Sequence, residues 1–139
     1  MKDNMKELTI GTEAVLTYVT EESRTARQMG SGSLAVLATP AVVALMEKAA
    51  CMLLAPYLPD DMTTVGTKIA VEHLSATPVG AAVTVKAVLT AIEDRKYCFD
   101  VTAEDIGGLI ARGQHERFLV KTERFLAKTY QKLEESSHA

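Results

Sequence analysis

The sequence predicts an α+β domain in which an antiparallel sheet wraps around one long buried helix, with an amphipathic helix near the C-terminus. Three observations predict it: one long apolar segment that starts at Thr39-Pro40, a series of segments with period-two alternation, and a last segment with helical spacing. The 139 residues match the length of one ordinary domain, so residues 1–139 are expected to form a single unit.

The first part of the chain is expected to supply one strand and one long loop. Leu8 to Val19 is rich in threonine and valine, which favours a strand. Thr20 to Ser33, "TEESRTARQMGSGS", is polar and ends in a glycine-serine cluster, so a loop with room for one helical turn is predicted. Loops of this length in a compact domain often act as lids or binding loops.

The long helix is expected to begin at Thr39-Pro40, with Thr39 as its N-cap and proline in the first turn. It runs to about Leu54 and stops before Pro56. Only Glu47 and its neighbour Lys48 interrupt its apolar sequence, so burial nearly all round is expected. One sheet cannot cover every side of such a helix. We therefore expect a homodimer or a larger assembly, with the helices near the shared interface.

After the helix the pattern changes to the period of two that is typical of strands. Turns are expected at 76–80, 93–95 and 106–108, and they separate four strands. The expected strands are 67–74, 82–92, 96–102 and 109–120. Thr122 then caps a final helix with an apolar stripe made of Phe125, Leu126, Tyr130 and Leu133.

Composition and charge exclude several classes of protein. Hydrophobic residues make up 47% and charged residues 24% of the chain, as in soluble globular proteins. The net charge of −3 and the lack of a basic block argue against a nucleic-acid partner. The sequence has no apolar run free of charge and proline that could span a membrane, and its start, "MKDNMKELTIG", lacks a signal segment. Cys51 and Cys98 are expected to be reduced core thiols, so a cytoplasmic location without membrane association is predicted.

Glu47 and His73 are the first candidates for chemistry. The helix offers Glu47 no cationic partner at three or four residues' distance, and a carboxylate in apolar surroundings suits a base or nucleophile. His73 shares a strand face with Ile69 and Val71, so it points toward the helix. Each also has an ordinary structural explanation: Glu47 as a glutamate at the helix surface, and His73 as a hydrogen-bonded histidine of the core. Together they make a stronger case for a site.

For the other polar positions and the glycines, a structural explanation is stronger than a functional one. Capping alone explains Thr39, although its hydroxyl and the amides of the first helical turn could stabilise an oxyanion. His115 alternates inward with Gly113 and Arg117 and is expected to be a hydrogen-bonded strand residue. Gly66 and Gly113 mark places where a backbone must come close. The sequence shows no phosphate loop, serine-hydrolase elbow or metal cluster, so no metal and no cofactor are expected.

Three segments together resemble the fluoroacetyl-CoA thioesterase group of hot-dog-fold proteins: "VLATPAVVALMEKAA", "TTVGTKIAVEHLSATPVG" and "GQHERFLV". The resemblance extends from about Gly30 to Phe125 with order and spacing kept. It implies one long helix wrapped by an antiparallel sheet, and a dimer.

The resemblance also implies a set of site residues. The family's catalytic threonine, glutamate and histidine match Thr39, Glu47 and His73, and its substrate-contacting glycine matches Gly66. The resemblance does not extend to fluoroacetate specificity. In the specialised enzyme of the family, aromatic residues of the lid region select the fluorinated acyl group. The corresponding segment here, "ARQMGSGSLAV", has none.

The expected activity is hydrolysis of a small acyl-CoA thioester to free acid and CoA. Glu47 would attack the carbonyl or activate water, His73 would transfer protons, and Thr39 would stabilise the oxyanion. Eight residues separate Thr39 from Glu47, or ~12 Å along a regular helix, so these two cannot be hydrogen-bonded. Candidates for binding the phosphates of CoA are Arg24, Arg27, Arg117 and Lys121. The alternatives are a non-catalytic acyl-CoA binding or sensing module and a hot-dog hydratase.

Overall fold

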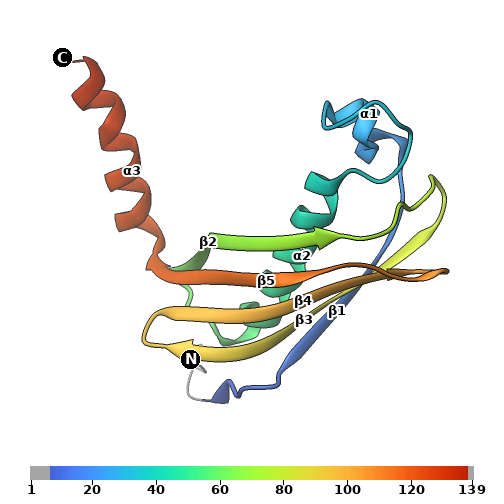
Figure 1. Cartoon of the computed structure of the whole chain (residues 1–139). Helices are drawn as coiled ribbons and strands as arrows, with labels where there is room; N and C mark the ends of the chain where they lie inside the picture. The colour runs from blue at the N-terminus through green and yellow to red at the C-terminus, as the bar shows by residue number, and fades with distance from the viewer. Residues whose placement is uncertain (1–6, 138–139) are drawn as a thin grey trace.

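A five-stranded antiparallel sheet and one long helix form the body of the molecule (Figure 1). The structure is a computed structural model, and it describes residues 7–137. The strand order is β1-β3-β4-β5-β2, with β1 and β2 at the two edges. The predicted α+β architecture is therefore confirmed. The strands are β1 (Glu13–Val19), β2 (Met62–His73), β3 (Ala82–Glu93), β4 (Lys96–Asp105) and β5 (Gly108–Lys121).

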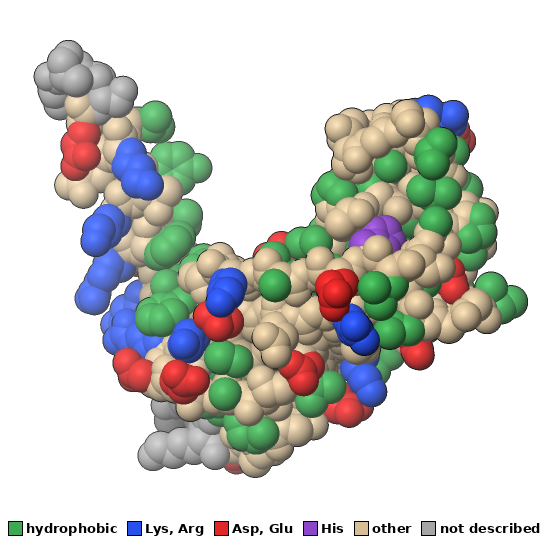
Figure 2. Space-filling model, viewed as in Figure 1, with side chains coloured by type: hydrophobic (Ala, Val, Ile, Leu, Met, Phe, Trp, Pro, Cys, Tyr) green, Lys and Arg blue, Asp and Glu red, His purple; other side chains and the backbone are tan. Residues whose placement is uncertain are grey.

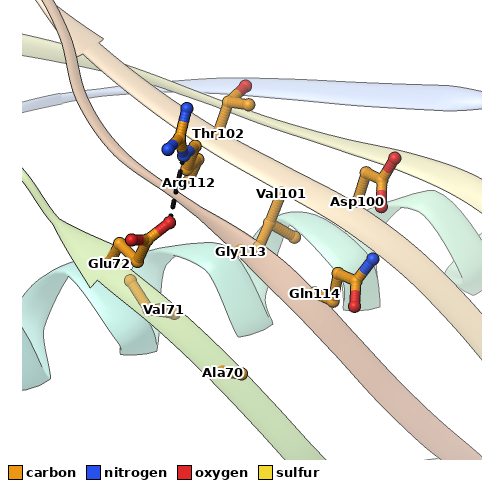
Figure 3. A pocket seen from close by; sticks show the side chains of 9 residues that line it. All are labelled: Ala70, Val71, Glu72, Asp100, Val101, Thr102, Arg112, Gly113 and Gln114. Carbon is orange, nitrogen blue, oxygen red and sulfur yellow. Dashed lines mark hydrogen bonds and ion pairs between the residues drawn. The ribbon is translucent and has the colours of Figure 1, made fainter.

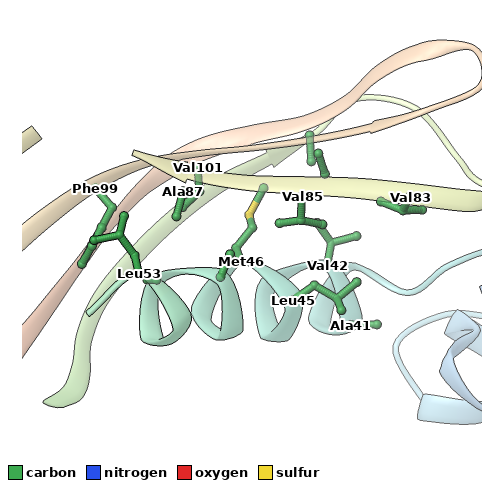
Figure 4. Close-up of a cluster of buried hydrophobic side chains, with 14 of the residues drawn as sticks. Ala41, Val42, Leu45, Met46, Leu53, Val83, Val85, Ala87, Phe99 and Val101 are labelled. Atoms are coloured by element: carbon green, nitrogen blue, oxygen red, sulfur yellow. The ribbon is translucent and has the colours of Figure 1, made fainter. Parts of the chain in front are cut away.

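The helix α2 (Thr39–Leu54) lies against one face of the sheet and continues into a short 3₁₀ turn, Ala55–Tyr57. Its buried residues recur at helical spacing, so they form one stripe. They pack against inward-facing residues of β3 and β4, which alternate as the sequence predicted (Figure 4). The stripe comprises Ala41, Val42, Leu45, Met46, Ala49, Ala50, Leu53 and Leu54.

The opposite side of α2 is not covered by the residues that the structure describes. Val43 is half-buried, Ala44 and Cys51 are exposed, and the Met52 side chain is 43% exposed. The expectation of burial nearly all round is therefore wrong for the single chain, because the sheet reaches only one side of the helix. Cys51 is not a core thiol for the same reason, and Cys98 is half-buried. Among the described residues, the segment Thr39–Tyr57 is long and apolar enough to cross a membrane, although nearly half of it is buried in the fold.

Residues 20–38, which we call the lid segment, connect β1 to α2. The segment contains a 3₁₀ turn, Glu22–Arg24, and the short helix α1, Ala26–Met29. Its two arms are joined where the Ala26 amide donates to the Val36 carbonyl oxygen at 2.8 Å. The predicted loop thus has internal hydrogen bonds, and it lies above the end of α2 where Thr39 is found (Figure 1).

The last helix, α3 (Thr122–Ser137), projects away from the sheet after β5 (Figure 1). The helix and its apolar stripe agree with the prediction, but the stripe is exposed rather than covered by other described residues. Figure 2 shows open space between α3 and the lid segment, with hydrophobic side chains along the helix. The exposed apolar residues of α3 are Phe125, Leu126, Tyr130 and Leu133.

Candidate active site

Thr39 and His73 form the first of two polar groups. Ala38, rather than Thr39, occupies the N-cap position, so the predicted capping role of Thr39 is wrong. Thr39 is the first residue of α2, and its hydroxyl oxygen lies 2.7 Å from His73 Nδ1. His73 is the last residue of β2 and pairs with Ala111. The threonine side chain therefore joins the start of the helix to the end of the edge strand.

The environment of His73 favours a neutral imidazole. Burial lowers its pKa below the ordinary value of 6.5, and a backbone hydrogen bond at Ser75 acts in the opposite direction. Nε2 is buried and has no hydrogen-bond partner among the described residues. A hollow of about 260 Å³ lies beside the ring, lined by Thr39, His73 and parts of the lid segment. A neutral imidazole with an unpartnered nitrogen can accept a proton.

Glu47 belongs to the second group, which lies further along α2. Its side chain is 40% exposed, and Oε2 lies 3.4 Å from Nη1 of Arg117 on β5. Arg117 is buried, and its Nε and Nη2 donate to the hydroxyl (2.9 Å) and carbonyl (3.0 Å) oxygens of Thr64. The cationic partner that α2 does not provide thus comes from the sheet. Arg117 is buried beside the half-exposed carboxylate, and its binding to a phosphate of CoA stays a prediction.

His115 completes this second group and is, as expected, a hydrogen-bonded strand residue. Its Nδ1 lies 2.7 Å from the carbonyl oxygen of Lys68, and its Nε2 lies 3.1 Å from Arg117 Nη1. The side chain is almost fully buried, and its ring stacks on Phe99 with centroids 5.9 Å apart. Burial lowers the pKa of His115, and the neighbouring Arg117 cation lowers it further against the opposing effect of the Lys68 carbonyl.

Gly66 makes room for the carboxylate. It lies at a shift of register between β2 and β5, next to the Glu47 side chain. A Cβ placed on Gly66 would lie 2.7 Å from Glu47 Oε2 and 3.1 Å from Arg117 Nη1. Glycine is therefore required for Glu47 to keep this position.

Gly66→Ala should lower kcat by on the order of 10- to 100-fold, with little loss of thermal stability. The crowded atoms are the ends of side chains, so Glu47 would turn away while the strand stays in place. Thiol release and thermal melting would measure the two effects. Gly107→Ala, in the turn between β4 and β5, is the matched control and should keep wild-type kcat. A fully active Gly66→Ala enzyme would contradict the importance of the carboxylate's position.

The structure brings Thr39 to His73 and Glu47 to Arg117 and Gly66, but no hydrogen bond joins the two groups among the described residues. The Glu47 contact to Arg117 was not predicted from the sequence. The available signal was the alternation in "GQHERFLV", which places His115 and Arg117 on the same inward face of β5.

A larger hollow lies elsewhere and contains none of the predicted site residues (Figure 3). Its volume is about 540 Å³, and strands β2, β4 and β5 line it. Glu72 and Arg112 form an ion pair of 3.1 Å there. Gly113 allows close packing of the strands, because a Cβ on it would overlap the carbonyl oxygen of Ala70. This hollow is wide and open to solvent, and its lining residues do not form a set of catalytic groups directed at one point.

The sequence matches that of known thioesterases along nearly its whole length. A family model described as fluoroacetyl-CoA-specific thioesterase matches residues 19–123. The chain is 37% identical over 138 residues to the fluoroacetyl-CoA thioesterase of Streptantibioticus cattleyicolor, and the match covers 95% of this chain and 97% of that protein.

Solved structures agree with the sequence comparison. The fluoroacetyl-CoA thioesterase FlK is 37% identical with a TM-score of 0.85, over 90% of this chain and 97% of that one. A variant of FlK in complex with fluoroacetate and CoA is 34% identical with a TM-score of 0.82, over 85% and 99% of the two chains. A thioesterase superfamily member from Thermus thermophilus is 26% identical with a TM-score of 0.89, over 97% and 100%. The predicted hot-dog fold is thereby confirmed, and the chain belongs to the fluoroacetyl-CoA-specific thioesterase family.

Proposed function

We propose that this chain hydrolyses a small acyl-CoA thioester to a free acid and CoA. Membership of a thioesterase family supports hydrolysis, and the complex of FlK with fluoroacetate and CoA supports an acyl-CoA substrate. The observation that carries the proposal is the placement of Glu47. A buried arginine holds one carboxylate oxygen, while the side chain stays 40% exposed and accessible to a substrate. A carboxylate that is fixed and accessible suits attack on a carbonyl carbon.

The proposed mechanism uses both polar groups. Because ~12 Å of helix separates Thr39 from Glu47 in one chain, the two groups act on one carbonyl where two subunits of a dimer bring them together. Glu47 attacks the thioester carbonyl or activates a water molecule that does so, and the carbonyl oxygen becomes an oxyanion. Thr39, held by His73, donates a hydrogen bond to this oxyanion together with backbone amides of the first turn of α2. The intermediate then collapses, the carbon–sulfur bond breaks and CoA leaves as the thiolate. Neutral His73 accepts the proton that the water loses and passes it to this thiolate. Where Glu47 is the nucleophile, water hydrolyses the resulting anhydride.

Release of free thiol from a panel of acyl-CoA thioesters tests the proposed function. Turnover of short acyl groups supports hydrolysis. Saturable binding without thiol release would indicate a binding or sensing module, and addition of water to an enoyl-CoA would indicate a hydratase. The proposal does not extend to specificity for a fluorinated acyl group, because the lid segment holds no aromatic residue after Ala26 that could select one.

We also propose that the protein is a homodimer in which the exposed side of α2 faces the partner subunit. That side carries Ala44, Cys51 and Met52, which are apolar and exposed, and it adjoins Glu47. Burial of such apolar surface is the usual driving force of association. Both cysteines are free thiols, which agrees with the cytoplasmic location that we propose.

Light scattering should give twice the mass of the 15.0 kDa chain at micromolar concentration. Met52→Glu places a charge on the exposed side of α2 and should raise the dimer dissociation constant at least about tenfold. Ile106→Glu is the matched control, since Ile106 is 98% exposed in the turn between β4 and β5. A stable wild-type monomer at this concentration would rule out the dimer.

A further inference from the structure

We propose that His115 is a positioning residue: in its neutral form it holds the Arg117 guanidinium, which in turn holds the Glu47 carboxylate. The proposal rests on the proposed thioester hydrolysis and assigns a part in it to a histidine that does not touch the substrate. A chain of contacts extends from the Lys68 carbonyl through His115 and Arg117 to Glu47.

The contact to Lys68 determines which ring nitrogen carries the proton. A carbonyl oxygen can only accept a hydrogen bond, so the 2.7 Å contact requires a proton on His115 Nδ1. In a neutral imidazole the other nitrogen is then an acceptor. Nε2 lies 3.1 Å from Arg117 Nη1, which can only donate. Lys68 therefore fixes the tautomer, and the tautomer gives Arg117 an acceptor.

The remaining contacts of Arg117 show why that acceptor matters. Thr64 occupies Nε and Nη2, so Nη1 is the part of the guanidinium directed at both His115 and Glu47. The Arg117 side chain is only 8% exposed, and water cannot readily replace a lost partner. Without the acceptor at His115, the guanidinium would shift toward a new partner, and the 3.4 Å contact to Glu47 would change with it.

Protonation of His115 should break this chain of contacts. The charged groups around the ring are Arg117 and Glu116 on β5 and Glu47 on α2, while β4 contributes the uncharged Phe99. A proton on Nε2 would direct an N–H at the N–H groups of Arg117 and place two cations in contact. The ring can therefore hold Arg117 only while it is neutral, and acidification would release Glu47.

The occupied Nε2 also separates the role of His115 from that of His73. The free nitrogen of His73 can exchange a proton with a substrate, whereas both nitrogens of His115 are bonded within the protein. Protonation of either histidine should stop turnover, so each histidine should add one to the limiting slope of log kcat in acid. Removing one titrating ring should lower that slope by one.

The test compares His115→Gln with His115→Leu. The glutamine amide oxygen can accept from Arg117 without titrating, so kcat at pH 7 should stay within about threefold while the acid slope falls by one. Leucine offers no acceptor, so kcat should fall about 10- to 100-fold with KM nearly unchanged. A leucine variant with wild-type kcat and pH profile would overturn the proposal. If that variant does not fold, an unchanged acid slope in the glutamine variant would overturn it.

Nitrogen-15 spectra of the histidine rings provide a readout that needs no substrate. Wild-type protein should show the His115 proton on Nδ1 at neutral pH, and the His115→Gln spectrum assigns the signal. A proton on Nε2 would overturn the inference even in an active enzyme. A wild-type protein that releases no thiol would instead disprove the proposed function, while the spectrum would still report the contact to Arg117.

Discussion

Glu47→Gln should lower kcat for thioester hydrolysis by at least on the order of 10²–10⁴-fold while the protein stays folded. Glutamine has nearly the same size and shape, and its amide oxygen can still accept from Arg117 Nη1. It cannot act as a nucleophile or as a base. Thr64 continues to bind the other guanidinium nitrogens, so thermal melting should change little. Thiol release and melting curves would measure both effects.

Glu72→Gln is the matched control for this variant. Glu72 pairs with Arg112 at 3.1 Å in the hollow of Figure 3, away from Glu47, so its loss tests the general effect of removing a paired carboxylate. This control should keep wild-type kcat. Equal activity of Glu47→Gln and wild type would make Glu47 a structural residue and remove the central part of the mechanism.

His73→Ala should lower kcat by ~10²–10⁴-fold, the usual contribution of a positioned acid–base group. Burial lowers the pKa of His73 below 6.5, so the neutral base is present at pH 7 and is lost as the pH falls through the lowered pKa. Wild-type activity should therefore decline only below the range of an ordinary histidine. The variant should lack this ionisation in its pH–rate profile. An unchanged profile would place the proton transfer at another group.

The 2.7 Å contact between Thr39 and His73 provides a control for the same experiment. Thr39→Ser keeps the hydroxyl and should remain active. Thr39→Ala and His73→Ala should each lower kcat, and the double variant should lose less than the product of the two factors, because both remove the same hydrogen bond. Independent effects would show that the two side chains act separately in turnover.

Periodicity in the sequence was enough to predict the helix and most of the sheet. Alternation in β3 and β4 identified the residues that pack on α2, and proline at position 56 marked where the helix ends. The strand β2 was predicted too short, because "MTTVG" holds polar residues and a glycine where the edge strand begins. The strand β1 was predicted too long, since it starts only at Glu13.

The polar contacts were less predictable. Thr39 has the residue type and position of a good N-cap, and its contact to His73 depends on where β2 ends in space. The pairing of Glu47 with Arg117 requires β5 to lie beside β2 and Gly66 to leave space, which are consequences of tertiary structure. The one-sided burial of α2 depends on the reach of a single sheet. Local sequence patterns do not contain this information.

The strand order also determines when the site can form during synthesis on the ribosome. β2 emerges before β5, the strand with which it pairs, and pairing of Met62 with Lys121 requires synthesis as far as residue 121. β1 likewise waits for β3. A nascent chain that ends before Arg117 already carries Thr39, Glu47 and His73, but it lacks the guanidinium that contacts the carboxylate. The active site can therefore be completed only after β5 has been synthesised, so a chain that stops before β5 does not have this arrangement.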